Sequence, residues 1–140
     1  MDPHLQHSLS ELLNAYRYAS VSIHRYHWEV RGATANQDHV LLGTVYQLLD
    51  TFVDGIGERI VGLGGVTPTV AAQGNFITTL AKENGEIDSM YLAYRLTELI
   101  AGKTNAVTTA TSDEGTKNLL AGYADQLEQQ VFFLRQRAMA

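Results

Sequence analysis

The sequence contains no cysteine among its 140 residues and only two prolines. The absence of cysteine excludes a disulfide framework, a thiolate metal site and a cysteine nucleophile. The N-terminal segment lacks the basic and apolar regions of a signal peptide, and no apolar run is long enough to cross a bilayer. These absences predict a cytoplasmic protein without a membrane-spanning segment.

Positive charge is also scarce. Ten lysines and arginines are scattered along the chain against fifteen aspartates and glutamates, which gives a net charge of −5 at pH 7. Because phosphate binding needs clustered positive charge, we do not expect a single chain to bind DNA directly. The length suits one domain with its own hydrophobic core, spanning residues 1–140.

Apolar residues recur at helical spacing in four long segments, which predicts an all-α protein. The segments are residues 3–32, 38–63, 86–109 and the stretch that begins after residue 113. Candidate N-terminal caps are Asp2 for the first, Asn36 or Asp38 for the second, and Ser112 or Asp113 for the fourth. The weaker pattern between residues 66 and 86 suggests a crossover with a short helix near residues 69–73. Two short links and one long connection predict an antiparallel four-helix bundle.

The second predicted helix has an unusual acidic face. Asp54 and Glu58 are four residues apart, so their carboxylates project from the same side about one turn apart. The same face also carries His39, Gly43, Asp50 and Gly57. Each glycine inside a helix costs up to about 1 kcal/mol relative to alanine. We therefore expect a partner to cover this face, because glycine lets another backbone approach closely.

Histidine adds nitrogen ligands to these oxygen ligands. His27, His39, Asp54 and Glu58 form a donor set that suits iron, manganese or zinc. His39 and Asp54 lie roughly 22 Å apart along one straight helix, which is too far for a shared ion. Either the two groups are unrelated, or an antiparallel second copy of the chain places its carboxylates beside the first chain's histidines. A two-fold dimer would then create two equivalent sites.

The order of these residues resembles the signature of the Dps-like miniferritins, the DNA-protection-during-starvation family of the ferritin-like superfamily. The matching residues are His27-Trp28-x-x-x-Gly32, His39, Asp54-x-x-x-Glu58-Arg59 and Leu63-Gly64-Gly65. In that family, two histidines of one subunit and an aspartate and a glutamate of its partner form a ferroxidase centre at a dimer interface. The resemblance implies a ferritin-like four-helix bundle with a short helix in the B–C crossover.

The resemblance also implies a function. His27, His39, Asp54 and Glu58 would be the catalytic and metal-binding residues of a dodecameric hollow shell built from two-fold dimers. The shell would oxidise Fe(II) to Fe(III) with hydrogen peroxide or dioxygen and store the product, which protects against oxidative damage. Iron would occupy each site as a di-iron or mono-iron centre, with zinc or manganese as substitutes.

Further residues are assigned by the same resemblance. Trp28 would adjoin the site and intercept stray oxidising equivalents, and Asp50 would lie beside the ligands. Asp113 and Glu114 match the acidic residues that line three-fold entry pores in the family. His24 lies one turn before His27, and we favour a helix-surface histidine over an additional ligand.

The sequence departs from the family pattern at several places, among them residues 35–38, where the usual aromatic and leucine residues are missing, and Asn118, which stands where a further pore acid often occurs. Acidic residues thought to seed the mineral usually follow the second histidine, whereas residues 40–44 here read Val-Leu-Leu-Gly-Thr. The lysine-rich tail through which some members bind DNA is missing. The missing tail argues against direct DNA binding, whereas the missing acidic residues support one alternative, a non-catalytic metal-binding or nucleic-acid-packaging shell protein.

Overall fold

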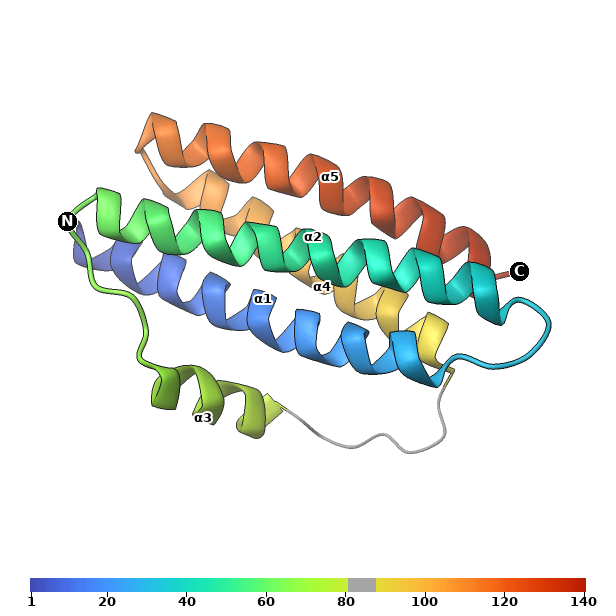
Figure 1. Ribbon diagram of the computed structural model, residues 1–140. Helices are drawn as coiled ribbons and strands as arrows, with labels where there is room; N and C mark the ends of the chain where they lie inside the picture. Colours follow the sequence, from blue (N-terminus) through green and yellow to red (C-terminus); the bar gives the residue numbers. More distant parts are fainter. Residues whose placement is uncertain (81–87) are drawn as a thin grey trace.

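A computed structural model describes residues 1–80 and 88–140, with the side chains of residues 78–80 left out of the description. All the regular secondary structure of the described residues is α-helical (Figure 1). Its helices are α1 (Pro3–Glu29), α2 (Ala35–Gly62), α3 (Val70–Leu80), α4 (Ser89–Ala110) and α5 (Glu114–Ala138). None of the helices in these two ranges has the length and hydropathy of a membrane span.

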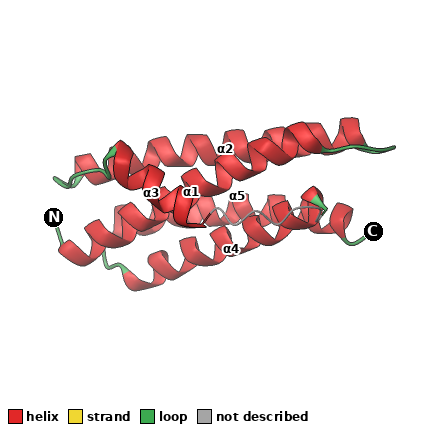
Figure 2. Cartoon of the chain, turned by 90° about the horizontal axis from the view of Figure 1, so that it is seen from below, coloured by secondary structure: helices red, strands yellow, loops and turns green. Residues whose placement is uncertain are grey.

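The four long helices form an antiparallel bundle. Helix α1 packs mainly against α2, and α4 packs mainly against α5, so each short link joins a pair of neighbours (Figure 1). Helix α3 belongs to the long crossover and lies outside the bundle against α1 (Figure 2). This arrangement confirms the predicted four-helix bundle with a short helix in the crossover.

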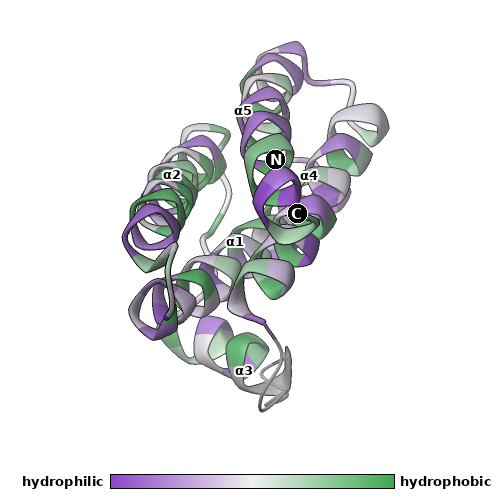
Figure 3. Ribbon diagram, turned by 90° about the vertical axis from the view of Figure 1, so that its right-hand side faces the viewer, coloured by the Kyte–Doolittle hydropathy of each residue, from purple (hydrophilic) through white to green (hydrophobic). Residues whose placement is uncertain are grey.

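The apolar stripes of the four helices meet in a single core. Viewed along the bundle, hydrophobic residues line the inward faces of the helices (Figure 3). The largest side chains that are completely buried there include Leu9, Tyr16, Ile23, Leu42, Leu49, Phe52, Ile56, Ile60, Met90, Ile100, Leu120 and Leu127. Because α2 turns its apolar stripe into this core, Asp54 and Glu58 are left on its exposed side.

Aspartate caps three of the long helices. The carboxylate of Asp2 accepts from the amide of His4, and that of Asp113 accepts from the amide of Thr116, as predicted for the first and last helices. Asp88 caps α4 in the same way. Helix α2 ends at the predicted glycines, where Gly64 adopts a φ of 83° that favours glycine.

The predicted start of the second helix is wrong. Helix α2 begins at Ala35, so neither Asn36 nor Asp38 caps it, and its N-cap Thr34 makes no side-chain cap bond. Asp38 is buried instead, with 2% of its surface exposed, and Arg137 binds both of its carboxylate oxygens at 2.8 Å. The carboxylate is thus used to join α2 to the end of α5.

The crossover helix is longer than predicted. Helix α3 continues past Gln73 and Gly74 to Leu80, because Phe76 packs against the bundle core and supports the added turns. Gln6 of α1 holds the start of the crossover by a pair of hydrogen bonds between its side-chain amide and the backbone of Val66. The predicted start of the third helix at Glu86 lies outside the described residues.

Candidate metal centre

His27 and His39 lie face to face where α1 ends and α2 begins. Their rings stack with centroids 3.6 Å apart and an angle of 19° between the ring planes. Two hydrogen bonds hold the pair: His27 Nδ1 donates to the carbonyl oxygen of His39 at 2.6 Å, and His39 Nδ1 donates to the carbonyl oxygen of His27 at 2.8 Å. The carbonyl of His27 belongs to the last turn of α1, where carbonyls lack partners within the helix.

These hydrogen bonds determine the chemical form of both imidazoles. A carbonyl oxygen only accepts hydrogen bonds, so each Nδ1 carries a proton, and Nε2 is the ring nitrogen that is left to bind a metal. Metal-binding histidines are commonly oriented in this way, with the second ring nitrogen donating to a carbonyl. The two stacked imidazoles are thus candidate nitrogen ligands that are oriented by contacts within the chain.

Small and aromatic residues surround this histidine pair. A Cβ atom at Gly43 would lie 3.1 Å from His27 Cε1, so glycine leaves room for the ring. His24 stacks on Tyr46 with ring centroids 4.0 Å apart, and it lies 4.4 Å from the ring of Trp28. His24, predicted as a helix-surface histidine, is half-buried, and these ring contacts give it a packing role. Trp28, which directly follows His27 in the sequence, is 66% exposed.

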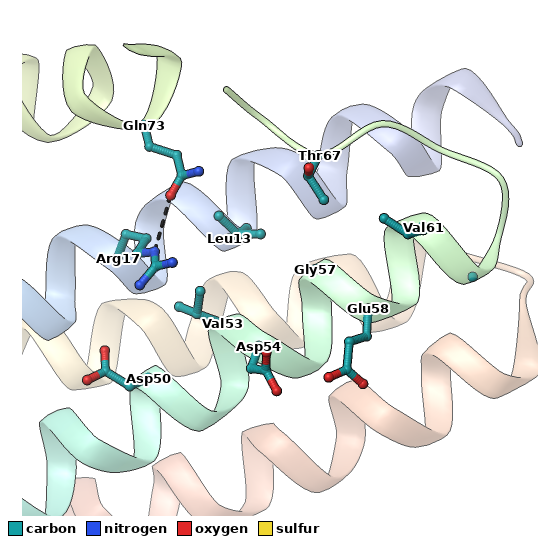
Figure 4. A pocket seen from close by; sticks show the side chains of 11 residues that line it. Leu13, Arg17, Asp50, Val53, Asp54, Gly57, Glu58, Val61, Thr67 and Gln73 are labelled. Carbon is teal, nitrogen blue, oxygen red and sulfur yellow. Dashed lines mark hydrogen bonds between the residues drawn. The ribbon is translucent and has the colours of Figure 1, made fainter. Parts of the chain in front are cut away.

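The carboxylates lie farther along α2 on the wall of an open groove. Figure 4 shows Asp50, Asp54 and Glu58 in succession along the helix, with Arg17 of α1 and Gln73 of α3 across from them. Hydrogen bonding to Asp54, together with the negative charge of Asp54, raises the pKa of Glu58 above its ordinary value. A cation placed between the two carboxylates would relieve this repulsion.

Two glycines of this helix make room for side chains of the same chain. Gly43 accommodates His27 of the same chain, and Gly55 accommodates Tyr123 of α5, whose hydroxyl would collide with a Cβ atom at that residue. A Cβ atom at Gly57 would meet only Leu13 Cδ1, at 3.9 Å. Packing within the subunit therefore accounts for two of these glycines. Coverage of the acidic face by a partner stays a prediction.

A single chain does not join the two halves of the predicted quartet. Within residues 1–80 and 88–140, no three histidine, aspartate or glutamate side chains gather closely enough to hold one metal ion. The structure brings His27 next to His39 and Asp54 next to Glu58. The histidine pair lies between the end of α1 and the start of α2, whereas the carboxylate pair lies in the second half of α2. The geometry is that of two half-sites.

The other predicted residues have identifiable local contacts. The hydroxyl of Ser20 donates to the Asp50 carboxylate at 2.5 Å, which fixes this acid on the groove wall. Asp113 caps α5, and its hydrogen bonds to Thr116 lower its pKa below the ordinary value. Glu114 lies in the first exposed turn of the same helix. The acidic start of α5 is thus partly structural.

Sequence reasoning missed Tyr123. Its ring stacks on Phe52 with centroids 3.8 Å apart and lies over Gly55. Burial raises the pKa of the Tyr123 phenol, and the charges of Asp54 and Glu58 raise it further. Nothing in the local sequence of α5 distinguishes this tyrosine from other partly buried apolar positions, because its environment is supplied by a different helix.

Comparisons with known proteins agree with this architecture. No family model matches the chain. In sequence, the chain is similar to DNA protection during starvation protein 2 of Bacillus anthracis, with 24% identity covering 81% of this chain and 82% of the relative. It is also similar to an uncharacterized protein of Haemophilus influenzae, with 27% identity covering 94% of this chain and 86% of the relative.

Solved structures give the same result. DpsC from Streptomyces coelicolor superimposes with a TM-score of 0.85 and 25% identity, covering 96% of this chain and 83% of that chain. The Dps protein from Vibrio cholerae O1, described as a member of a broad superfamily of ferritin-like diiron-carboxylate proteins, has a TM-score of 0.83 and 22% identity, covering 96% and 89% of the two chains. The fold implied by the histidine–carboxylate motif is confirmed: this chain has the Dps-like, ferritin-like four-helix fold.

Proposed function

We propose that the protein is a miniferritin that binds ferrous iron and oxidises it at sites shared between subunits. His27 and His39 of one subunit would face Asp54 and Glu58 of the partner subunit across a two-fold axis. Isologous contact of this kind completes two equivalent sites for each dimer. The mixed nitrogen and oxygen donor set suits iron, and manganese or zinc would compete for it.

The proposal is carried by the arrangement of the two half-sites, the histidine pair His27–His39 and the carboxylate pair Asp54–Glu58. Both histidines are oriented by Nδ1 hydrogen bonds that leave Nε2 as the ligand atom. The two carboxylates are close enough that one raises the proton affinity of the other. A ferrous ion between the carboxylates would relieve their repulsion, and the oriented histidines of the partner subunit would supply its nitrogen donors.

The proposed reaction balances with peroxide as the oxidant. Two ferrous ions give one electron each to hydrogen peroxide, its O–O bond breaks, and two protons complete two molecules of water. The products are two ferric ions, which would pass into the interior of a dodecameric shell. We place this activity in the cytoplasm, with dioxygen as the second oxidant.

Trp28, Asp50, Asp113 and Glu114 support the proposed activity. Trp28 would quench stray oxidising equivalents beside the histidines, and Asp50 would extend the negative field of the ligand carboxylates. Asp113 and Glu114 would line the entry pores for ferrous iron. Protection of DNA would follow from the removal of iron and peroxide, since the chain has no clustered basic segment with which to bind DNA.

Anaerobic loading with ferrous iron tests the proposal. Peroxide and air are then added separately, ferric absorbance is recorded, and light scattering measures particle size. We expect rapid oxidation by a dodecamer that His27→Ala and Glu58→Ala abolish without dispersing it. His7→Ala, an exposed histidine outside the site, is the matched control and should oxidise iron like the parent protein.

A second candidate function is a shell without enzymatic activity. It is favoured by the apolar residues that follow His39, where Val40 is 67% exposed and lines a groove with Leu41 and Phe133. A wall of this kind offers no carboxylate to a growing mineral. Ferrous oxidation no faster than in buffer, by an intact assembled particle, would select this function and reject the ferroxidase.

A further inference from the structure

We propose that Tyr123 donates an electron and a proton at the acid pair when hydrogen peroxide reacts at a site that holds a single ferrous ion. This inference rests on the proposed function, because it adds a redox partner to the same site. It concerns a residue of α5, a helix that contributes none of the four proposed ligands.

Tyr123 reaches across the bundle to the carboxylate side of α2. A Cβ atom at Gly55 would collide with the Tyr123 hydroxyl and lie 3.1 Å from its Cζ atom, so the phenol rests on the helix backbone at this residue. Gly55 directly follows Asp54 and precedes Glu58 by three residues. Residues three apart in a helix are neighbours on one face, so the hydroxyl over Gly55 lies on the Glu58 side of α2. The negative charges of Asp54 and Glu58 accordingly raise the pKa of the phenol.

The Tyr123 ring continues into a series of aromatic rings. It stacks on Phe52 at 3.8 Å with an angle of 15° between the ring planes, and Phe52 lies 6.1 Å from Tyr16 in the core. Tyr123 is the member of this series whose hydroxyl lies against α2 at Gly55, whereas Phe52 and Tyr16 are buried in the core.

Proton transfer distinguishes Tyr123 from Tyr16. Oxidation of a phenol to a neutral radical requires loss of its proton, so a proton acceptor must be nearby. Tyr16 is completely buried and its hydroxyl contacts that of Thr104, which is a poor base. Tyr123 has two carboxylates beside it. The radical therefore forms and stays on Tyr123.

One ferrous ion and Tyr123 together supply the two electrons that reduce hydrogen peroxide. The ferrous ion gives one electron to hydrogen peroxide and the O–O bond breaks. The O–H bond of Tyr123 also breaks; its electron reduces the remaining oxygen, and its proton passes through the Asp54–Glu58 pair to that oxygen. One further proton from solvent completes two water molecules, and the products are one ferric ion and a neutral tyrosyl radical. The next ferrous ion, with one proton, restores the phenol.

Rapid-freeze electron paramagnetic resonance tests this inference. The assembled protein is loaded anaerobically with one ferrous ion per site, mixed with one equivalent of hydrogen peroxide and frozen. We expect a tyrosyl radical signal that is lost in Tyr123→Phe, which keeps the ring stacked on Phe52. Release of hydroxyl radical, measured by a spin trap, should increase in the same variant.

Tyr94→Phe is the matched control. The Tyr94 hydroxyl donates to a carboxylate oxygen of Glu98 at 3.4 Å, so it also pairs a phenol with an acid, but on α4. This variant should keep the radical signal of the parent protein. Peptide mapping after repeated peroxide turnover gives an independent measurement on the unmodified chain, in which oxidation products should collect on Tyr123.

The outcomes separate the two proposals. A parent protein that oxidises iron but forms no tyrosyl radical, or whose radical persists in Tyr123→Phe, overturns this inference and leaves the ferroxidase intact. Oxidation products that collect on other tyrosines overturn it in the same way. A parent protein that does not oxidise ferrous iron overturns the proposed function and this inference with it.

Discussion

At the scale of the residue, Gly43 controls the orientation of His27. Alanine at this site would gain up to about 1 kcal/mol of helix propensity, but its Cβ atom would press on the imidazole at 3.1 Å from Cε1 and 3.3 Å from Nδ1. We expect Gly43→Ala to lower ferrous oxidation by about tenfold or more, as for other changes that disturb the orientation of a ligand histidine. Thermal unfolding should change little.

Gly102→Ala is the control for this prediction. Gly102 lies inside α4, and no described atom outside its own helix would approach a Cβ atom there within 4 Å. This substitution should gain the same helix propensity and leave iron oxidation unchanged. Equal oxidation by both variants would show that the His27 ring does not need the space above Gly43.

Glu58 gives the metal-free protein a characteristic pH dependence. Its folded-state pKa is raised by Asp54, so its contribution to stability is complete below the pKa of the unfolded chain and is lost as the pH rises through the folded-state pKa. Glu58→Gln removes this titration. In the presence of a chelator, we expect the variant to have a higher melting temperature than the parent protein at pH 7, and this advantage to disappear at pH 4. Parallel melting curves at both pH values would contradict the assignment.

At the scale of the element, Arg137 holds the end of α5 to the start of α2. Its guanidinium binds both oxygens of the buried Asp38 and the hydroxyl of Thr34. Arg137→Ala would leave the carboxylate buried without its cation, which costs about 3 kcal/mol because the arginine itself is partly exposed. Arg135→Ala, two residues earlier on the exposed side of α5, should cost little.

A double variant checks that the effect comes from the pair. Asp38→Ala combined with Arg137→Ala should be less destabilised than the sum of the two single variants, because each single change leaves one charged group without its partner. Denaturant unfolding of the four proteins measures this coupling. Strictly additive free energies of unfolding would show that Asp38 and Arg137 act independently.

The sequence predicts the elements whose stabilising contacts lie close together along the chain, and it fails where the partner is distant. The apolar stripes and the caps Asp2 and Asp113 are local, so the four helices and most of their ends could be predicted. Asp38 was mistaken for a cap because its partner, Arg137, lies almost a hundred residues away in the chain. The fit of Tyr123 over Gly55 escaped prediction for the same reason.

At the scale of the whole molecule, the structure separates one donor set into two half-sites. The ligand types and their spacing along the chain could be predicted, because the motif lies within two adjacent helices. The glycine argument for a partner was weaker, since His27 and Tyr123 of the same chain occupy the space at Gly43 and Gly55. Assembly therefore needs a test that does not depend on glycine packing.

Hybrid shells provide that test. One parental variant carries His27→Ala and His39→Ala, and the other carries Asp54→Ala and Glu58→Ala, so neither oxidises iron alone. When equal amounts are unfolded and refolded together, half of the two-fold dimers are mixed, and each mixed dimer contains one intact site and one doubly defective site. We expect oxidation to return to about a quarter of the parent rate. No recovery in well-assembled hybrids would show that each site is built within a single subunit.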